Sequence, residues 1–195
     1  MISKHAIIER KSFFISIILA YKNFSLSYCR QSKVFQSERG LLLLAFTASL
    51  ILFMANLPVQ FVNMSVMADT DLITHIGLIG FVSLFFLPPF LYFIAGCIFL
   101  IFRIFSGVAS FYQLRLALFW SLNVSGPILI VNGLLKGFLY DFEFIKYVNS
   151  ILELLIAWVI SAMLAKAEQF RSKFPTFLIA SAFVLSPHLV VFISS

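Results

Sequence analysis

The sequence predicts an all-α integral membrane protein, a bundle of five transmembrane helices with an amino-terminal amphipathic interfacial helix. Three observations predict this class. Hydrophobic residues make up 62% of the 195 residues and charged residues only 11%, whereas soluble domains are roughly a quarter charged. After Gly40, apolar stretches of about 18 residues or more match a hydrocarbon layer about 30 Å thick. Seven of the fourteen Lys and Arg residues precede Gly40, and the others lie at the ends of apolar stretches.

The composition and the motifs exclude several classes of function. The net charge of +6 does not indicate nucleic-acid binding, because the basic residues are placed as topology determinants rather than on one face. Cys29 and Cys97 are the only cysteines, so neither a disulfide framework nor a zinc site is predicted. The sequence contains no motif of a serine hydrolase, a zinc protease or a nucleotide-binding loop. We therefore expect no enzymatic activity, with no catalytic, metal-binding or cofactor-binding residues and no cofactor.

Residues 1–39 form a basic arm before the membrane domain. Apolar residues at helical spacing, Ile7, Phe14, Ile18 and Tyr21, lie between basic residues. This pattern predicts a helix that lies in the membrane interface against anionic lipid headgroups. A disordered basic tail is the alternative. A cleaved secretory signal is not favoured, because the apolar run is short and no small-residue cleavage pattern follows it.

Residues 40–195 form the membrane domain, and its apolar segments predict five crossings. Pro58 marks the expected end of the first, and Pro175 suits the first turn of the last. The predicted spans are residues 40–58, 72–104, 115–137, 148–165 and 175–193, each taken as approximate.

The second span is unusually long. It has no charge until Arg103 and would measure about 46 Å as one helix, half again the hydrocarbon thickness. Pro88 and Pro89 lie at its centre and remove backbone donors, so we expect a single helix kinked there. Folding the span into a hairpin at the two prolines would leave two legs of about 15 residues, each short for a full crossing.

The basic residues predict the orientation of the chain. The arm, the loop with Arg103 and Arg115, and the segment after the fourth span are basic, whereas the first loop and the carboxyl terminus carry no Lys or Arg. The third loop, with Lys136 and Lys146, is neutral because it also holds two carboxylates. The positive-inside rule therefore predicts an inner-membrane protein with a cytoplasmic amino terminus and an external carboxyl terminus.

Polar residues inside the predicted spans are the candidate functional positions. Glu153, His188, His75 and Asn132 all fall in the predicted outer leaflet. A carboxylate and two imidazoles could bind a transition metal or pass a proton. More often, such residues make one interhelical hydrogen bond and serve packing, which is the favoured interpretation.

Small residues indicate which way Glu153 faces. Ala157, Ser161 and Ala165 follow it at steps of four, so one narrow helix face of small residues begins at the carboxylate. We expect Glu153 to face into the bundle, either protonated or paired with a cation. Gly133 and Gly137 form a further small-residue motif at the end of the third span.

Several segments of the sequence also resemble a known family. They are SERGLLLLAF at the start of the first span, ANLP at its end, FLPPFLYFIAG in the second and SFYQLRLALFWSLNVSGP in the third. From Ser37 to about Phe138 the chain is similar to small bacterial members of the Yip-one-domain family, relatives of the eukaryotic Ypt/Rab-interacting membrane proteins. The resemblance implies a five-helix bundle with a cytoplasmic amino terminus. It marks Arg115, Trp120 and Pro127 as family-pattern residues of structural or interface importance. The aspartate-leucine-tyrosine-glycine-proline motif of the eukaryotic members is absent from the sequence.

Two functions remain open from the sequence. The leading hypothesis is a non-enzymatic multi-pass protein that organises lipid or partner membrane proteins. Its expected partners are the lipid bilayer, with anionic lipid bound through the arm, and membrane proteins or a second copy of the chain, with no nucleic acid. The alternative is a small transporter or permeation subunit, in which the kinks at Pro88, Pro89 and Pro127 open a path and Glu153 titrates.

Overall fold

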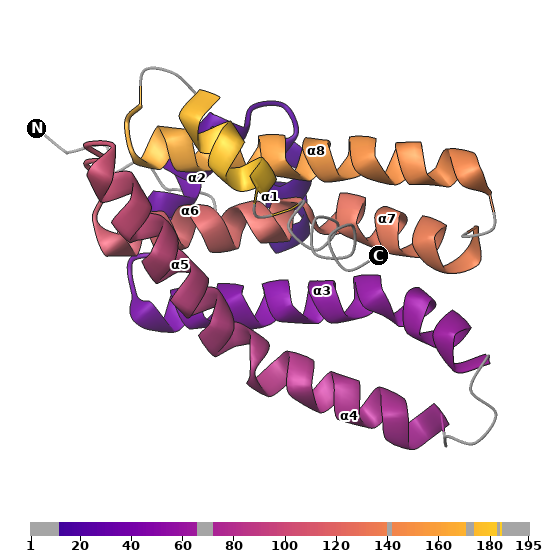
Figure 1. Ribbon diagram of the computed structural model, residues 1–195. Coiled ribbons are helices and arrows are strands. Elements are labelled where there is room, and N and C mark those ends of the chain that lie inside the picture. The colour runs from indigo at the N-terminus through magenta and orange to yellow at the C-terminus, as the bar shows by residue number, and fades with distance from the viewer. Residues whose placement is uncertain (1–11, 66–71, 140–141, 171–173, 183, 185–195) are drawn as a thin grey trace, which may run out of the picture.

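A computed structural model describes residues 12–65, 72–139, 142–170, 174–182 and 184. All regular secondary structure in these ranges is helical, which confirms the predicted all-α class. Residues 174–182 form a further helical segment, drawn in yellow in Figure 1. The labelled helices are α1 (Phe13–Ala20), α2 (Phe24–Val34), α3 (Glu38–Ser65), α4 (Leu72–Phe85), α5 (Leu87–Ile104), α6 (Phe111–Val124), α7 (Gly126–Phe138) and α8 (Glu143–Ala167) (Figure 1).

One end of the bundle gathers the start of α3, the end of α5, the start of α6 and the end of α8. Glu38 in α3 pairs with Arg115 in α6 at 2.7 Å. Glu168, just after α8, accepts a hydrogen bond at 2.9 Å from the backbone N–H of Ala109, in the loop before α6. Arg103 in α5 donates to the carbonyl of Gly107 in the same loop at 3.1 Å. We call this the arm end, because α1 and α2 pack there against α6 and α8.

The opposite end gathers the end of α7, the start of α8 and the second half of α3. Gly137 of α7 lies against Pro58 of α3, and Lys136 of α7 pairs with Glu153 of α8 at 2.6 Å. We call this the far end. Successive long helices therefore run in alternating directions between the two ends, as Figure 1 shows for α3, α6–α7 and α8.

The lengths and composition of the helices suit a membrane protein. In the described part of the chain, Glu38–Val62, Leu87–Ile104 and Glu143–Ala167 are each long and apolar enough to cross a membrane. The pair α6 and α7, bent by 50° at Ser125, makes a fourth if it counts as one span. Ile73–Phe85 is a shorter apolar helix, and most of the predicted span 175–193 lies outside the described residues.

Two helices extend beyond the spans predicted for them. Beyond the predicted span end at Pro58, α3 continues through this proline to Ser65. Proline lacks one N–H, and membrane helices tolerate the loss of a single backbone hydrogen bond. The helix of the third predicted span starts at Phe111, four residues before the predicted span, because Ser110 and Gln113 cap it reciprocally through their side chains.

The second predicted span, 72–104, forms α4 and α5, which are interrupted at Phe86. Pro88 and Pro89 lie in the first turn of α5, where missing N–H groups leave no intrahelical bond unmade. In Figure 1, α5 continues beyond the end of α4 instead of folding back along it, so the prolines do not form a hairpin.

The arm differs from the predicted single interfacial helix. It contains two helices, α1 and α2, that pack on the bundle, while Ile7 lies outside the described residues. The tryptophan of α6, Trp120, is fully buried, and its indole N–H donates to the hydroxyl of Ser27 in α2 at 2.9 Å. The spacing of apolar residues did not predict this docking, because the docking depends on polar side chains that face the bundle.

Candidate functional site

The far end holds a buried ion pair. Glu153 is 5% exposed, and its Oε1 lies 2.6 Å from Nζ of Lys136, whose side chain is 34% exposed. A carboxylate at this depth is costly unless it is paired, and the lysine supplies the opposite charge. Lys136 was expected in a loop, but α7 extends past it to Phe138, which brings the ammonium group to α8.

The ion pair lines a cavity of about 330 Å³ between α3, α7 and α8. Two amides also line this far-end cavity, Asn56 from α3 and Asn132 from α7. Asn132 is 6% exposed, and among the described residues its Oδ1 has no hydrogen-bond partner. A cavity with a charged pair and an unsatisfied amide can hold water or a small polar ligand.

Glycines of α7 bring the walls of this cavity together. A Cβ added at Gly133 would overlap the carbonyl oxygen of Ala55 in α3, and one at Gly137 would lie 2.5 Å from Cβ of Pro58. The two backbones approach so closely only because these positions carry no side chain. On α8, the small face of Ala157, Ser161 and Ala165 is also buried.

The structure brings only some of the predicted site residues together. Asn132 and Glu153 share the far-end cavity. His75 does not, because among the described helices α4 packs against α3 and α5 alone, and α3 lies between it and α8 (Figure 1). His188 lies outside the described residues. Within the described ranges, no group of three or more His, Cys, Asp or Glu residues could hold a metal ion.

The residues singled out by the family resemblance lie along α6 and at its break. Arg115 binds Glu38 through both terminal nitrogens, at 3.0 and 2.7 Å, and its guanidinium lies 4.4 Å from the ring centroid of Phe111. This arrangement fixes the start of α3 against α6. Trp120 is fully buried, and Pro127 occupies the first turn of α7 directly after the bend.

The arm reaches the bend as well. The hydroxyl of Tyr21 donates to the carbonyl of Val124, the last residue of α6, at 2.8 Å. Burial raises the pKa of the Tyr21 phenol above its usual value, so the group stays a neutral donor. Phe13 meets the indole of Trp120 edge-on, with 5.8 Å between ring centroids. Together with the bond from Trp120 to Ser27, these contacts anchor the arm along α6.

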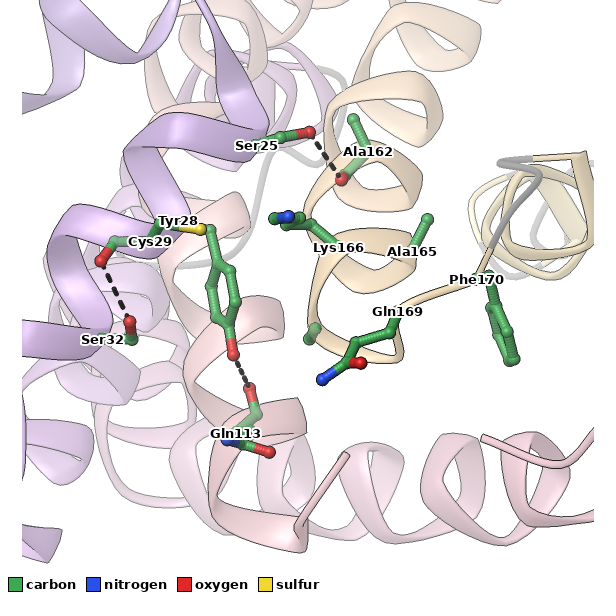
Figure 2. A pocket seen from close by; sticks show the side chains of 11 residues that line it. Ser25, Tyr28, Cys29, Ser32, Gln113, Ala162, Ala165, Lys166, Gln169 and Phe170 are labelled. Atoms are coloured by element: carbon green, nitrogen blue, oxygen red, sulfur yellow. Dashed lines mark hydrogen bonds between the residues drawn. The ribbon is translucent and has the colours of Figure 1, made fainter. Parts of the chain in front are cut away.

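A second cavity, of about 490 Å³, lies between α2, the start of α6 and the end of α8 (Figure 2). We call it the arm pocket. Its polar lining includes Ser25 and Tyr28 from α2, Gln113 from α6, and Lys166 and Gln169 from the end of α8. Burial, followed by the nearby Cys29 and Glu168, raises the pKa of the Tyr28 phenol to about 12. Its phenol is therefore neutral at physiological pH.

Sequence reasoning missed three of these positions for identifiable reasons. The capping box of Ser110 and Gln113 is readable as S-x-x-Q before an apolar run. Lys136 falls inside the predicted span 115–137, and its place four residues after Asn132, on the same helical face, could have added it to the polar residues of that span. Nothing in the sequence pattern indicates that Glu168 binds the N–H of Ala109.

No protein-family model, curated protein or solved structure matches the chain. The resemblance to the Yip-one-domain family therefore stays a prediction from the sequence segments that carry it.

Proposed function

We propose that this chain is a non-enzymatic multi-pass membrane protein that organises anionic lipid, and membrane proteins associated with it, around its docked arm. It would cross the inner membrane five times, through α3, α4–α5, α6–α7, α8 and the segment that begins at residue 174. The described basic residues favour a cytoplasmic arm end, since Arg30, Lys33, Arg103 and Lys166 lie there and only Lys136 and Lys146 lie at the far end.

The contrast between the two arm helices carries this proposal. Along α1, Ile17 and Ala20 are buried against the bundle, while Phe14 and Ile18 on the outer side are 73% and 69% exposed. A helix that is apolar on both sides does not suit a water-facing surface, so its outer side would contact lipid. By contrast, α2 exposes Arg30 and Lys33, which suit a negatively charged headgroup layer.

Lipid analysis of the purified full-length protein tests the proposal. We expect phosphatidylglycerol or cardiolipin to co-purify in excess of its share in the membrane. The single variants Arg30→Gln and Lys33→Gln should each reduce that excess, since each basic residue near the surface contributes about 1 kcal/mol of attraction. Lys146→Gln removes an exposed charge from the far end and should leave it unchanged. Equal lipid profiles for all four proteins would contradict the proposal.

The orientation has its own test. Reporter fusions at each terminus should place the amino terminus in the cytoplasm and the carboxyl terminus outside. Fusions that find both termini in one compartment would rule out five crossings.

A second candidate function rests on the far-end cavity. The bent pair α6–α7 and the buried pair of Glu153 and Lys136 resemble the broken helices and intramembrane charges of small transporters. In proteoliposomes, Glu153→Gln should then abolish a proton or ion flux that the wild type supports. Glu143→Gln, an exposed carboxylate at the start of the same helix, is the matched control. Absence of flux in the wild type would remove this candidate.

A further inference from the structure

The arm pocket has the chemistry of an anion site. Among the described residues that line it, Lys166 alone carries a charge. In the part of the chain that the structure describes, Lys166 makes no ion pair. Glu168, two residues further along the chain, is outside the lining, is 2% exposed, and accepts the N–H of Ala109. The cation thus has no negative partner within the described protein.

The neutral groups around Lys166 can donate further hydrogen bonds. The hydroxyls of Ser25 and Tyr28 donate to backbone carbonyls at 3.4 and 3.5 Å. Both distances are long for O–H donors, so each hydroxyl could donate instead to a ligand oxygen that lies closer. Gln113 uses its Oε1 to accept the N–H of Ser110, which leaves its NH₂ group as a donor. Figure 2 shows Lys166 and Gln169 extending from the end of α8 into the space beside α2.

The place of the pocket favours a lipid over a soluble ion. Lys166 is in the last turn of α8, a helix long and apolar enough to cross a membrane, so the pocket lies where such a helix reaches the headgroup layer. Ala162, Ala165 and Phe170 add apolar lining beside the polar groups. Its volume of about 490 Å³ falls in the usual range of small-molecule sites, about 300 to 1,000 Å³.

We propose that the arm pocket binds a phosphate group through Lys166, and that an anionic glycerophospholipid in the adjoining leaflet supplies this phosphate. The lipid headgroup fills the space between α2 and α8, with its phosphate at the ammonium and its glycerol against the alanines of α8. The inference rests on the proposed function and assigns it one specific site.

Native mass spectrometry of the full-length protein tests the site. The probes are dioctanoyl phosphatidylglycerol, the zwitterionic dioctanoyl phosphatidylcholine, glycerol 3-phosphate and inorganic phosphate. We expect one saturable site for the phosphatidylglycerol. Lys166→Gln should weaken it by about tenfold, the usual scale for one hydrogen bond from a charged donor. Lys166→Arg should keep the affinity within about threefold of the wild type, because the charge remains.

The control is Lys146→Gln, which removes the same charge from an exposed position nearer the other end of α8. It should leave the affinity unchanged. Equal weakening by both glutamine variants, or none by Lys166→Gln, would place the lipid elsewhere and overturn the site. Binding of glycerol 3-phosphate or inorganic phosphate as tight as that of the lipid would overturn the lipid source.

The two proposals fail in distinguishable ways. Unchanged phosphatidylglycerol affinity in Lys166→Gln, together with reduced lipid enrichment in Arg30→Gln, overturns the pocket and leaves the arm as the lipid-organising element. Wild-type protein that binds phosphatidylcholine and phosphatidylglycerol equally, and co-purifies with neither in excess, overturns both.

Discussion

At the far end α3 and α7 touch backbone to backbone, whereas α1 and α2 reach α6 through side chains such as those of Tyr21, Tyr28 and Trp120. The far-end contact depends on missing side chains at Gly133 and Gly137. The arm-end contact depends on added ones, such as the phenol of Tyr21 and the indole of Trp120. A backbone contact cannot adjust to added volume, while side-chain contacts can rearrange around a ligand.

The two ends also differ in whether their charged side chains are paired inside the protein or exposed. The far end buries one carboxylate with its own lysine as partner. The arm end pairs Glu38 and buries Glu168, but it leaves the cations Arg30, Lys33 and Lys166 exposed. A charge paired inside the protein contributes to the fold, whereas exposed cations at a membrane surface are available to lipid. Substitutions should therefore reduce stability most at the far end and change binding most at the arm end.

Gly133→Ala should have the largest effect on stability. Its new methyl group would overlap the carbonyl of Ala55, and because that neighbour is backbone, α3 and α7 must separate. We expect a loss of about 3 kcal/mol, the upper end for overpacking. Thermal or SDS-induced unfolding of purified protein in detergent measures it. Gly96→Ala in α5 has no atom within 4 Å of the new Cβ and should be neutral or slightly stabilising. Equal loss in both variants would mean that α3 and α7 do not touch at Gly133.

Removing the carboxylate of the far-end ion pair should cause the next largest loss of stability. Glu153→Gln leaves Lys136 without its partner, but the lysine side chain is one-third exposed, so solvent relieves part of the cost. We expect a loss of about 2 kcal/mol in the same unfolding assay, below the 3–5 that fully buried pairs lose. Glu143→Gln, on an exposed carboxylate, should change the stability by less than about 0.5 kcal/mol. A Glu153→Gln protein as stable as the wild type would show that the pair is not formed.

The hydrogen bond between Ser27 in the arm and Trp120 in α6 should contribute less to stability. Ser27→Ala removes the acceptor of the Trp120 indole N–H and leaves this buried donor unsatisfied. We expect a loss of about 1 kcal/mol, the usual cost of one such hydrogen bond. Tryptophan fluorescence should also shift as the indole environment changes. Ser150→Ala, a hydroxyl on the exposed face of α8, is the control. An unchanged spectrum and stability would mean that α2 does not dock on α6.

The sequence predicts the helices and their breaks better than it predicts which helices lie side by side. Apolar length and composition predict the all-α class, and the prolines at 88, 89 and 127 lie beside the observed breaks because their missing N–H groups suit a first helical turn. Depth along a span places Asn132 and Glu153 at the same level, and the structure puts them in one cavity. The depth of a residue in the membrane does not show which helices are neighbours. His75 was therefore grouped with Asn132 and Glu153, although α3 separates α4 from α8.

The arm was harder to predict for a related reason. Apolar periodicity gives no signal for burying Ser27, Tyr28 and Gln31, yet all three are buried. Their partners, such as Trp120 and the backbone of Gln113, are about ninety residues away in the chain, as the separations of 93 and 85 show. Local patterns cannot pair groups at that distance.

Tyr28→Phe should have the smallest effect at neutral pH and a visible one only in alkali. The hydrogen bond to Gln113 is long, at 3.5 Å, so its loss should cost less than about 0.5 kcal/mol. Folding raises the pKa of this phenol from 10.0 to about 12, chiefly by burial, so the folded state holds the proton more tightly than the unfolded state. The resulting stabilisation is fully present below pH 10 and is lost as the pH rises through 12. Unfolding midpoints between pH 9 and pH 12 should therefore fall more steeply for the wild type than for Tyr28→Phe. Parallel pH profiles of the unfolding midpoint would show that Tyr28 is not buried between α2 and α6. Tyr28 would then not line the arm pocket.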